Sequence, residues 1–134
     1  FNSIMKDGEM GLFKSYKDGV ADGQQLRDFI YVKDLCKVIL FMMDHPEING
    51  LFNLGTGQAR SFYDLCKNTF EAMDKAVNIK FVDMPETLRP KYQYYTQATM
   101  EKLRKAGYTA PFYTLEEGVR DYVQNYLMQD YKIY

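Results

Sequence analysis

The sequence has few of the residues on which several common kinds of site depend. Its 134 residues include two cysteines, one histidine and no tryptophan. Cys36 and Cys66 are too few for a disulfide framework, and with His45 they cannot supply the four ligands of a structural zinc ion. This cysteine usage fits a reducing compartment, so we expect a cytoplasmic protein with no metal site.

The sequence also has no excess of charge of either sign and no long apolar run. Its 17 basic residues are balanced by 18 acidic ones, for a net charge of −1, and such a surface does not gather polyanions. The longest apolar run covers residues 38–43, far short of the roughly 18 residues that cross a bilayer. We therefore expect neither nucleic acid nor a membrane as a partner.

The residues that are present predict one compact domain. Apolar residues make up 46% of the chain, enough for one core at this length. The first five residues, Phe-Asn-Ser-Ile-Met, have the pattern of the end of an apolar-faced helix that stops at Gly8. Such a beginning indicates either a piece of a longer protein or a trimmed domain.

The pattern along the chain predicts an α/β order of short strands and four to five helices. The expected strands are residues 11–16, 28–32, 51–54 and 79–82. The expected helices are residues 35–44, 61–76, 97–105 and 115–130, with caps at Asp34, Ser61, Thr96 and Thr114. Residues 17–25 are expected to form a mobile surface loop, and residues 86–95 an irregular functional loop.

The helix expected over residues 35–44 is apolar around most of its circumference, where a surface helix has one stripe of about 100°. We expect it to present a face to a neighbouring domain or subunit. The alternative is that it forms the central helix of this domain.

A glycine turn, Gly55-Thr56-Gly57, follows an expected strand and precedes an expected helix. This order imitates the start of a dinucleotide-binding fingerprint. However, Arg60 stands at the third glycine position, and Asp83 follows only loosely at the place of a ribose-binding acid. We favour a tight turn, with a dinucleotide site as the alternative.

The other chemical groups do not combine into a nucleophilic triad. His45 precedes a proline at a helix end, where it is expected to cap the helix. The two cysteines lie in amphipathic patterns and are expected in the core, and Glu116 and Glu117 are expected as first-turn acids. The remaining cations and aromatic residues either bind a phosphorylated ligand or solvate the surface; they are Lys14, Ser15, Tyr16, Arg27, Lys91 and Tyr92.

Three motifs resemble a known family. Residues 27–34, Arg-Asp-Phe-Ile-Tyr-Val-Lys-Asp, are similar to a segment of the extended short-chain dehydrogenase/reductases that act on nucleotide sugars. Residues 52–57, Phe-Asn-Leu-Gly-Thr-Gly, resemble the strand and turn that come after it. The more selective run at 91–98, Lys-Tyr-Gln-Tyr-Tyr-Thr-Gln-Ala, is similar to the ADP-L-glycero-D-manno-heptose 6-epimerase family. The resemblance covers nearly the whole chain from about Leu12 and less than half of that family's protein.

The resemblance implies the carboxyl-terminal, substrate-binding portion of such an enzyme. Residues 1–134 would form one substrate-binding fragment, and an amino-terminal Rossmann domain that holds NADP would lie outside it. That family inverts a heptose carbon by transient oxidation to a ketone and return of the hydride. Its catalytic serine, Tyr-x-x-x-Lys pair, second lysine and glycine fingerprint precede the matched region. We therefore expect no catalytic or cofactor-binding residue here, and no activity from this chain alone.

The resemblance also implies where the substrate would bind and which partners the protein would have. The matching positions are Phe13, Lys14, Ser15, Tyr16, Arg27 and Tyr92. The expected partners are ADP-heptose, destined for the lipopolysaccharide core, the Rossmann domain of the same protein, and further copies in a homo-oligomer. One alternative is another extended short-chain enzyme, such as a nucleotide-sugar 4-epimerase or 4,6-dehydratase. Another is a non-catalytic interaction module with an aromatic docking surface.

Overall fold

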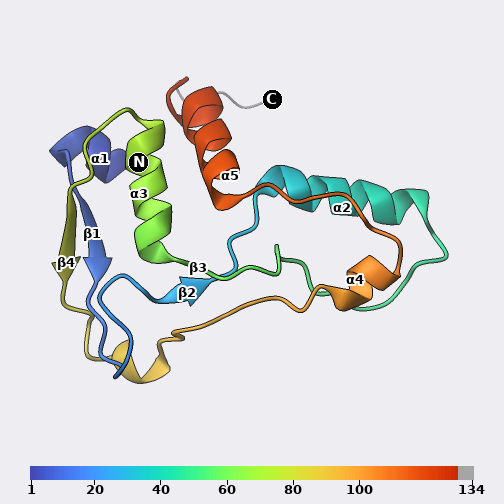
Figure 1. Cartoon of the computed structure of the whole chain (residues 1–134), viewed down its shortest axis with the longest axis horizontal. Helices are drawn as coiled ribbons and strands as arrows, with labels where there is room; N and C mark the ends of the chain where they lie inside the picture. Colours follow the sequence, from blue (N-terminus) through green and yellow to red (C-terminus); the bar gives the residue numbers. More distant parts are fainter. Residues whose placement is uncertain (130–134) are drawn as a thin grey trace.

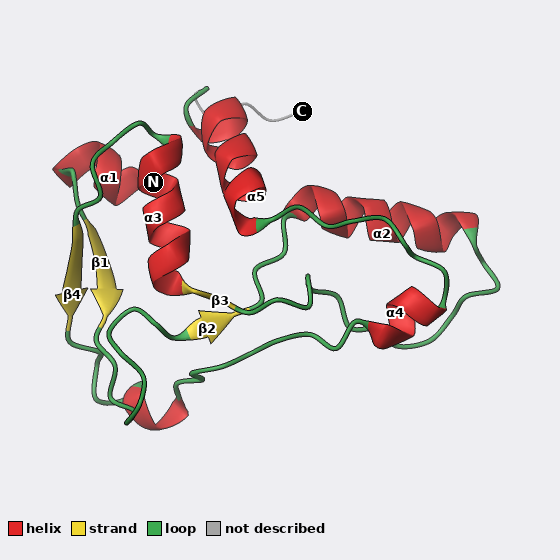
Figure 2. Ribbon diagram, viewed as in Figure 1, coloured by secondary structure: helices red, strands yellow, loops and turns green. Residues whose placement is uncertain are grey.

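The computed structural model describes residues 1–129, whose helices and short strands form two groups (Figures 1 and 2). The first group contains α1 (Asn2–Asp7), β1 (Met10–Phe13), α3 (Phe62–Ala72), β4 (Ile79–Val82), α5 (Leu115–Tyr122) and a π-helical turn, η2 (Val123–Leu127). The second contains α2 (Val32–Asp44) and α4 (Glu101–Lys105). The short strands β2 (Leu26–Arg27) and β3 (Arg60–Ser61) lie between them, and η1 (Arg89–Lys91) is a 3-10 turn. The predicted α/β class is confirmed.

Two small sheets set the positions of the loops. Strands β1 and β4 are parallel, with Phe13 opposite Val82, so the residues that follow the two strands leave the sheet at the same end. Strands β2 and β3 are antiparallel. On its other side β2 bonds to the segment 94–96, because the Leu26 amide donates to the Tyr94 carbonyl (2.9 Å) and the Thr96 amide to the Leu26 carbonyl (3.2 Å).

Two hydrophobic clusters correspond to the two groups of elements. Buried Ile4 and Phe70 join α1 to α3, and Val123 adds the carboxyl-terminal helix. In the second cluster Val38 of α2 packs with Leu103 of α4 and Tyr108. Each cluster is small, because a chain of this length divides its apolar residues between them.

Three of the local signals for helix ends are confirmed. Ser61 and Asp64 form a capping box at α3, and Thr114 and Glu117 form one at α5. Gly8 ends α1 with a φ of 68°, a conformation that favours glycine. Sequence neighbours alone determine these features, so the sequence pattern was sufficient.

Two predicted strands are wrong. Residues 28–31 form no strand, because the carboxylate of Asp28 accepts the amides of Thr56 and Gly57 and the helix α2 begins at Val32. Asp34 does not cap this helix; it is buried in the first turn, where it accepts the Tyr113 amide. Residues 51–54 pair with no strand within residues 1–129, because no strand edge lies beside them there.

The helix predicted over 97–105 begins later than predicted, at Glu101. Thr96 does not cap it, because the amide of Thr96 bonds to β2 and its hydroxyl bonds to Gln93. Helix α3 ends at Ala72, four residues before the predicted end, and the chain then turns at Asp74 with a positive φ of 53°. The helix predicted to reach Asp130 continues only as the π-helical turn to Leu127, and Asp130 lies outside the described residues.

Residues 17–25 were predicted to form a mobile surface loop. This prediction is wrong for the end of the segment. Gln25 is only 1% exposed, and its amide nitrogen donates to the Phe13 carbonyl (3.2 Å). The Gly23 carbonyl accepts the Tyr63 amide (2.9 Å). The end of this loop is therefore fixed against β1 and α3.

The predicted core position is confirmed for Cys66 but wrong for Cys36, which is exposed on α2. His45 ends α2 and bonds through Nδ1 to the Phe41 carbonyl (2.8 Å), as the capping prediction requires. Within residues 1–129, no helix combines the length and the apolar character that crossing a bilayer requires.

Residues 1–129 do not enclose helix α2, so the central-helix alternative is wrong for the described part of the chain. Only Val38 is buried among its apolar residues, whereas Ile39, Leu40 and Met43 are 50%, 58% and 70% exposed. In Figure 1 the helix extends away from α3 and α5. We call its outward apolar surface, which also includes Val32 and Leu35, the outer face of α2.

Asp121 fastens the start of α2 to α5. It accepts the Tyr31 hydroxyl (2.5 Å), the Lys33 ammonium (2.7 Å) and the Asn125 amide (2.8 Å). The bond from Lys33, followed by that from Tyr31, lowers the pKa of Asp121 to about 2 from a usual 3.8. The ionised carboxylate therefore stabilises the fold above pH 4.

We predict that this stabilisation is lost as the pH falls from about 4 to 2, because the unfolded carboxyl group takes up its proton first. Asp121→Asn should lower the free energy of unfolding by about 1–2 kcal/mol at pH 7 and have a much smaller effect near pH 2. Urea unfolding at both pH values measures this. Glu101→Gln, which removes a charge from an exposed ion pair, is the control. An equal loss for both variants would contradict the prediction.

Candidate functional site

The parallel sheet brings the residues after β1 beside those after β4. The Lys14 amide continues the ladder by donating to the Val82 carbonyl (2.9 Å). The Lys14 ammonium then meets the Asp83 carboxylate at 3.0 Å. The same oxygen of Asp83 accepts the Tyr16 hydroxyl at 3.0 Å. Residues 14–16 are thus held beside Asp83.

Arg89 of η1 covers the ring of Tyr16. Its guanidinium carbon lies 3.8 Å from the ring centroid, and Nη2 donates to the Tyr16 hydroxyl (3.2 Å). Nε donates to the Met84 carbonyl (2.9 Å), which fixes the arginine to its own loop. The Tyr16 amide donates to the Tyr94 hydroxyl (3.0 Å). The loop over residues 86–95 therefore closes against the segment after β1.

A hollow of about 290 Å³ lies next to this cluster. Its walls include Phe13, the buried Gln25, Phe62 and Tyr92, together with the backbone of Gly11. Phe13 and Tyr92 meet edge to face with their ring centroids 6.4 Å apart. The hollow is thus lined by aromatic rings with the polar groups of Gln25 and Tyr92 among them, which is the usual lining of a small-molecule site.

Arg27 supplies a cation between the aromatic walls. Its guanidinium carbon lies 5.5 Å from the Tyr92 ring and 5.8 Å from the Phe62 ring. It donates to the Leu26 carbonyl (2.7 Å) and to the Gln93 carbonyl. Because both acceptors are neutral, the positive charge of the guanidinium is not cancelled by them.

The six predicted site residues do not all take the same part in this arrangement. Phe13 and Tyr92 line the hollow and Arg27 stacks beside them, whereas Lys14 and Tyr16 meet at Asp83. Ser15 turns toward its own loop: its amide donates to Asp22 (2.6 Å) and its hydroxyl to the Lys17 carbonyl.

Four residues that complete the arrangement were not among the predicted site residues. Gln25 forms a wall, Asp83 anchors Lys14, and Arg89 and Tyr94 hold Tyr16. The position of Asp83 directly after a strand was noted, but only as that of a ribose-binding acid. For Gln25 no local pattern could have predicted burial, because its partners lie on β1.

The protonation states of the site residues favour the binding of an anionic or hydroxylated ligand. The hydrogen bond from Lys14 lowers the pKa of Asp83, and the same bond raises the pKa of Lys14. Burial raises the pKa values of the Tyr16 and Tyr92 hydroxyls. At neutral pH the site therefore has charged amino and guanidinium groups and protonated tyrosines, which donate hydrogen bonds to anionic or hydroxylated ligands.

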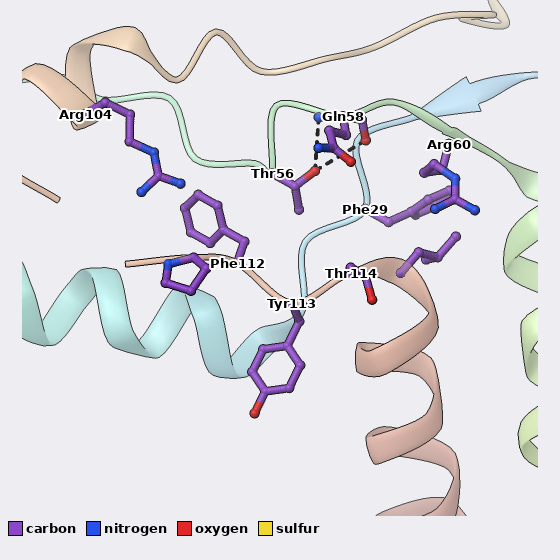
Figure 3. Close-up of a pocket in the computed structure, with 10 residues that line it drawn as sticks. Phe29, Thr56, Gln58, Arg60, Arg104, Phe112, Tyr113 and Thr114 are labelled. Atoms are coloured by element: carbon purple, nitrogen blue, oxygen red, sulfur yellow. Dashed lines mark hydrogen bonds between the residues drawn. The ribbon is translucent and has the colours of Figure 1, made fainter. Parts of the chain in front are cut away.

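A second hollow, of about 280 Å³, lies at the start of α5 and contains two arginines, Arg60 and Arg104 (Figure 3). Arg60 is paired with Glu116 (2.6 Å) and with Asp64 (3.3 Å). Arg104 donates to the carbonyls of Tyr108 and Ala110. The two carboxylates offset the charge of Arg60, whereas the acceptors of Arg104 are neutral. None of the six predicted site residues lines this hollow.

The glycine turn is a tight turn closed by a side chain of the chain itself. Gly57 has a φ of 80°, and the amides of Thr56 and Gly57 donate to the Asp28 carboxylate at 2.7 and 2.9 Å. A dinucleotide fingerprint would direct such amides to a pyrophosphate. The residues of this turn therefore do not fit a dinucleotide phosphate.

Comparison with known proteins gives relatives over nearly the whole chain. The NAD dependent epimerase/dehydratase family matches residues 4–55. An ADP-L-glycero-D-manno-heptose-6-epimerase of Fusobacterium nucleatum is 48% identical over 97% of this chain and 41% of its own length. One from Nitratidesulfovibrio vulgaris (strain DP4) is 50% identical over 95% of this chain and 39% of its own length. The chain thus spans about two fifths of these relatives.

Solved structures share the fold. The Helicobacter pylori ADP-L-glycero-D-manno-heptose-6-epimerase matches 92% of this chain and 34% of its own, with 27% identity and a TM-score of 0.72. A UDP-N-acetylglucosamine 4-epimerase from Methanobrevibacter ruminantium, at 21% identity and a TM-score of 0.75, matches 96% of this chain and 37% of its own. The fold is that of part of an extended short-chain dehydrogenase/reductase. Over nearly all of its length, the chain resembles the carboxyl-terminal part of the ADP-L-glycero-D-manno-heptose-6-epimerases, as its motifs predicted.

Proposed function

We propose that this chain forms the substrate-binding part of an NADP-dependent epimerase that inverts the C6 centre of ADP-heptose. The observation that carries the proposal is the hollow between Phe13 and Tyr92, with the Arg27 guanidinium beside it. Relatives that are 48–50% identical and bear the name of this epimerase support the same substrate.

In this proposal Arg27 and Lys14 bind the diphosphate, because guanidinium and ammonium groups pair with phosphate oxygens. Tyr92 and Phe13 pack against the ring systems of the ligand, and the Tyr92 and Tyr16 hydroxyls donate hydrogen bonds to it. The Ser15 hydroxyl joins them after it leaves the Lys17 carbonyl. The Asp83 carboxylate competes for Lys14 and Tyr16 until the ligand binds. The part of this chain is to bind and orient the nucleotide sugar.

The reaction itself needs groups outside this chain. NADP supplies transient oxidation and the return of the hydride, and the turn at Gly55–Gly57 does not fit it because Asp28 occupies its amides. We propose that a Rossmann domain of the longer protein holds NADP, and that the 134-residue chain alone is inactive. A cytoplasmic location and supply of the lipopolysaccharide core complete the proposal.

A second candidate is another extended short-chain enzyme that acts on a nucleotide sugar. The matching fold of a 4-epimerase with UDP-N-acetylmuramic acid bound favours it. The two candidates differ in the base and sugar that they accept, so a panel of ADP and UDP sugars separates them. A non-catalytic interaction module would bind none of these ligands.

We predict that the full-length protein, purified with its bound NADP quantified, interconverts the two C6 epimers of ADP-glycero-manno-heptose. Chromatographic separation of the epimers after incubation measures the conversion. UDP-glucose and dTDP-glucose serve as control substrates. Conversion of a control substrate in place of the heptose would favour the second candidate, and conversion of none would refute the proposal.

Arg27→Ala and Tyr92→Phe should each weaken ADP binding by roughly 1–3 kcal/mol, through loss of the charged and hydroxyl contacts. Titration calorimetry of the full-length protein with ADP measures the loss. Arg120→Ala, which changes the charge of α5 away from the hollow, is the matched control. Unchanged affinity in both site variants would show that the hollow is not the ligand site.

The outer face of α2 is proposed to contact the rest of the longer protein. Cys36 lies on this face, between the exposed Val32 and Leu40, whereas Cys66 is buried in α3. We predict that a maleimide labels Cys36 in the 134-residue chain and not in the full-length protein. Cys66, whose pKa burial raises to about 11, should stay unlabelled in both.

Mass spectrometry of tryptic peptides distinguishes the two sites. Labelling of Cys66 would show that the short chain is unfolded, and the comparison would then use full-length protein before and after limited proteolysis. Protection of Cys36 that depends on the concentration of the short chain would indicate a second copy on this face, as in a homo-oligomer. Equal labelling of Cys36 in both proteins would refute the contact.

A further inference from the structure

One carboxylate, that of Asp28, joins three segments of the chain. Its Oδ1 accepts the Thr56 amide (2.7 Å) and the Thr56 hydroxyl (2.6 Å). Its Oδ2 accepts the Gly57 amide (2.9 Å) and the Ala98 amide (3.1 Å). These four bonds, against the cost of burial, lower the pKa of Asp28. The side chain is therefore a fixed anion at neutral pH.

The junction has no spare volume. A Cβ at Gly55 would come within 2.5 Å of the Asp28 carboxylate and 2.6 Å of the Ala98 Cβ. Only a residue without a side chain fits between them. The glycine turn, Asp28 and Ala98 thus pack in van der Waals contact as well as through hydrogen bonds.

This junction connects the two chain segments that contain Arg27 and Tyr92, the residues of the proposed ligand site. Asp28 directly follows Arg27, and Ala98 ends the run that begins at Tyr92. The same run is also bonded to Leu26 through the Tyr94 carbonyl and the Thr96 amide, and the Arg27 guanidinium donates to the Gln93 carbonyl. A shift of the run at Ala98 therefore displaces the Tyr92 ring relative to the Arg27 guanidinium.

We propose that Asp28 is a positioning residue for nucleotide-sugar binding, which acts by holding the run 92–98 against β2 so that the Arg27 guanidinium carbon stays 5.5 Å from the centre of the Tyr92 ring, at the side of the hollow. The proposal rests on the proposed function and adds to it a residue that does not line the hollow. The Asp28 carboxylate has no role in the chemistry itself.

Asp28→Asn is the sharpest variant, because it keeps the shape of the side chain. An asparagine oxygen can still accept from Thr56, but the asparagine nitrogen is a donor and faces the donating amides of Gly57 and Ala98. The substitution therefore breaks the bonds to Ala98 and Gly57 while it retains the two bonds to Thr56. Loss of the bond to Ala98 is the intended perturbation.

Asp34→Asn is the matched control. Asp34 belongs to the same sequence motif, is fully buried, and accepts the Tyr113 amide at 2.7 Å and the Lys37 ammonium at 3.1 Å. Its bonds lie at the start of α2, and neither Asp34 nor Tyr113 lines the hollow. Its replacement also breaks a buried carboxylate bond, so it reports the general cost to stability.

The experiment compares full-length wild type, Asp28→Asn and Asp34→Asn. Calorimetry gives the Kd for ADP, steady-state assays of heptose epimerisation give KM and kcat, and thermal unfolding gives Tm. For Asp28→Asn we expect Kd and KM to rise about tenfold with kcat within about twofold of wild type, since uniform binding is lost. For Asp34→Asn we expect a lower Tm with Kd unchanged.

The outcomes separate the two proposals. Wild-type protein that neither binds ADP nor epimerises the heptose refutes the proposed function. Wild-type activity together with an unchanged Kd and KM in Asp28→Asn, or an equal change in Asp34→Asn, overturns the positioning role. If Asp28→Asn does not fold, Thr56→Val replaces it. This variant removes the 2.6 Å bond from the Thr56 hydroxyl to Asp28, together with the two bonds between that hydroxyl and Gln58, and so loosens the carboxylate. A raised Kd for ADP then supports the role and an unchanged Kd overturns it.

Discussion

The rest of the structure depends on the hydrogen bonds along both edges of the short strand β2 (Leu26–Arg27). One edge bonds to β3, which leads into α3, and the other bonds to the segment 94–96. Because a two-residue strand has few bonds of its own, the neighbouring carboxylate of Asp28 secures the same segments beyond the strand. Three parts of the chain that are distant in sequence therefore meet at one place, and the hollow forms beside it.

Sequence patterns predicted whatever neighbours in the chain determine. The two capping boxes, the glycine stop of α1 and the strand at 79–82 were correct, because each depends on residues a few positions apart. The predictions over 28–32 and at Thr96 were wrong for one shared reason. The Asp28 side chain accepts amides 28 and 70 residues away, and the Thr96 amide donates to the distant Leu26 carbonyl. No local propensity reports such partners.

The candidate site was predictable only in part, and by two different routes. Composition left the cations undecided between a ligand and solvent, since most exposed arginines and lysines only solvate a surface. The motif resemblance selected Phe13, Arg27 and Tyr92, which the structure brings together. Neither composition nor the motif resemblance predicted Gln25 and Asp83 as site residues. Gln25 is placed by its bond to β1, and Asp83 by the parallel pairing of β1 with β4.

The outer face of α2 and the unpaired segment 51–54 have one physical cause. A strand needs a neighbouring edge for its backbone groups, and an apolar helix face needs apolar contacts to leave water. Within residues 1–129 neither finds one, although Phe52 and Leu54 pack beneath α2 and so place the segment alongside the helix. The segment 51–54 thus packs on the Val38 side of α2, whereas the outer face of α2 stays exposed within the described residues, so the sequence patterns report two separate unmet contacts.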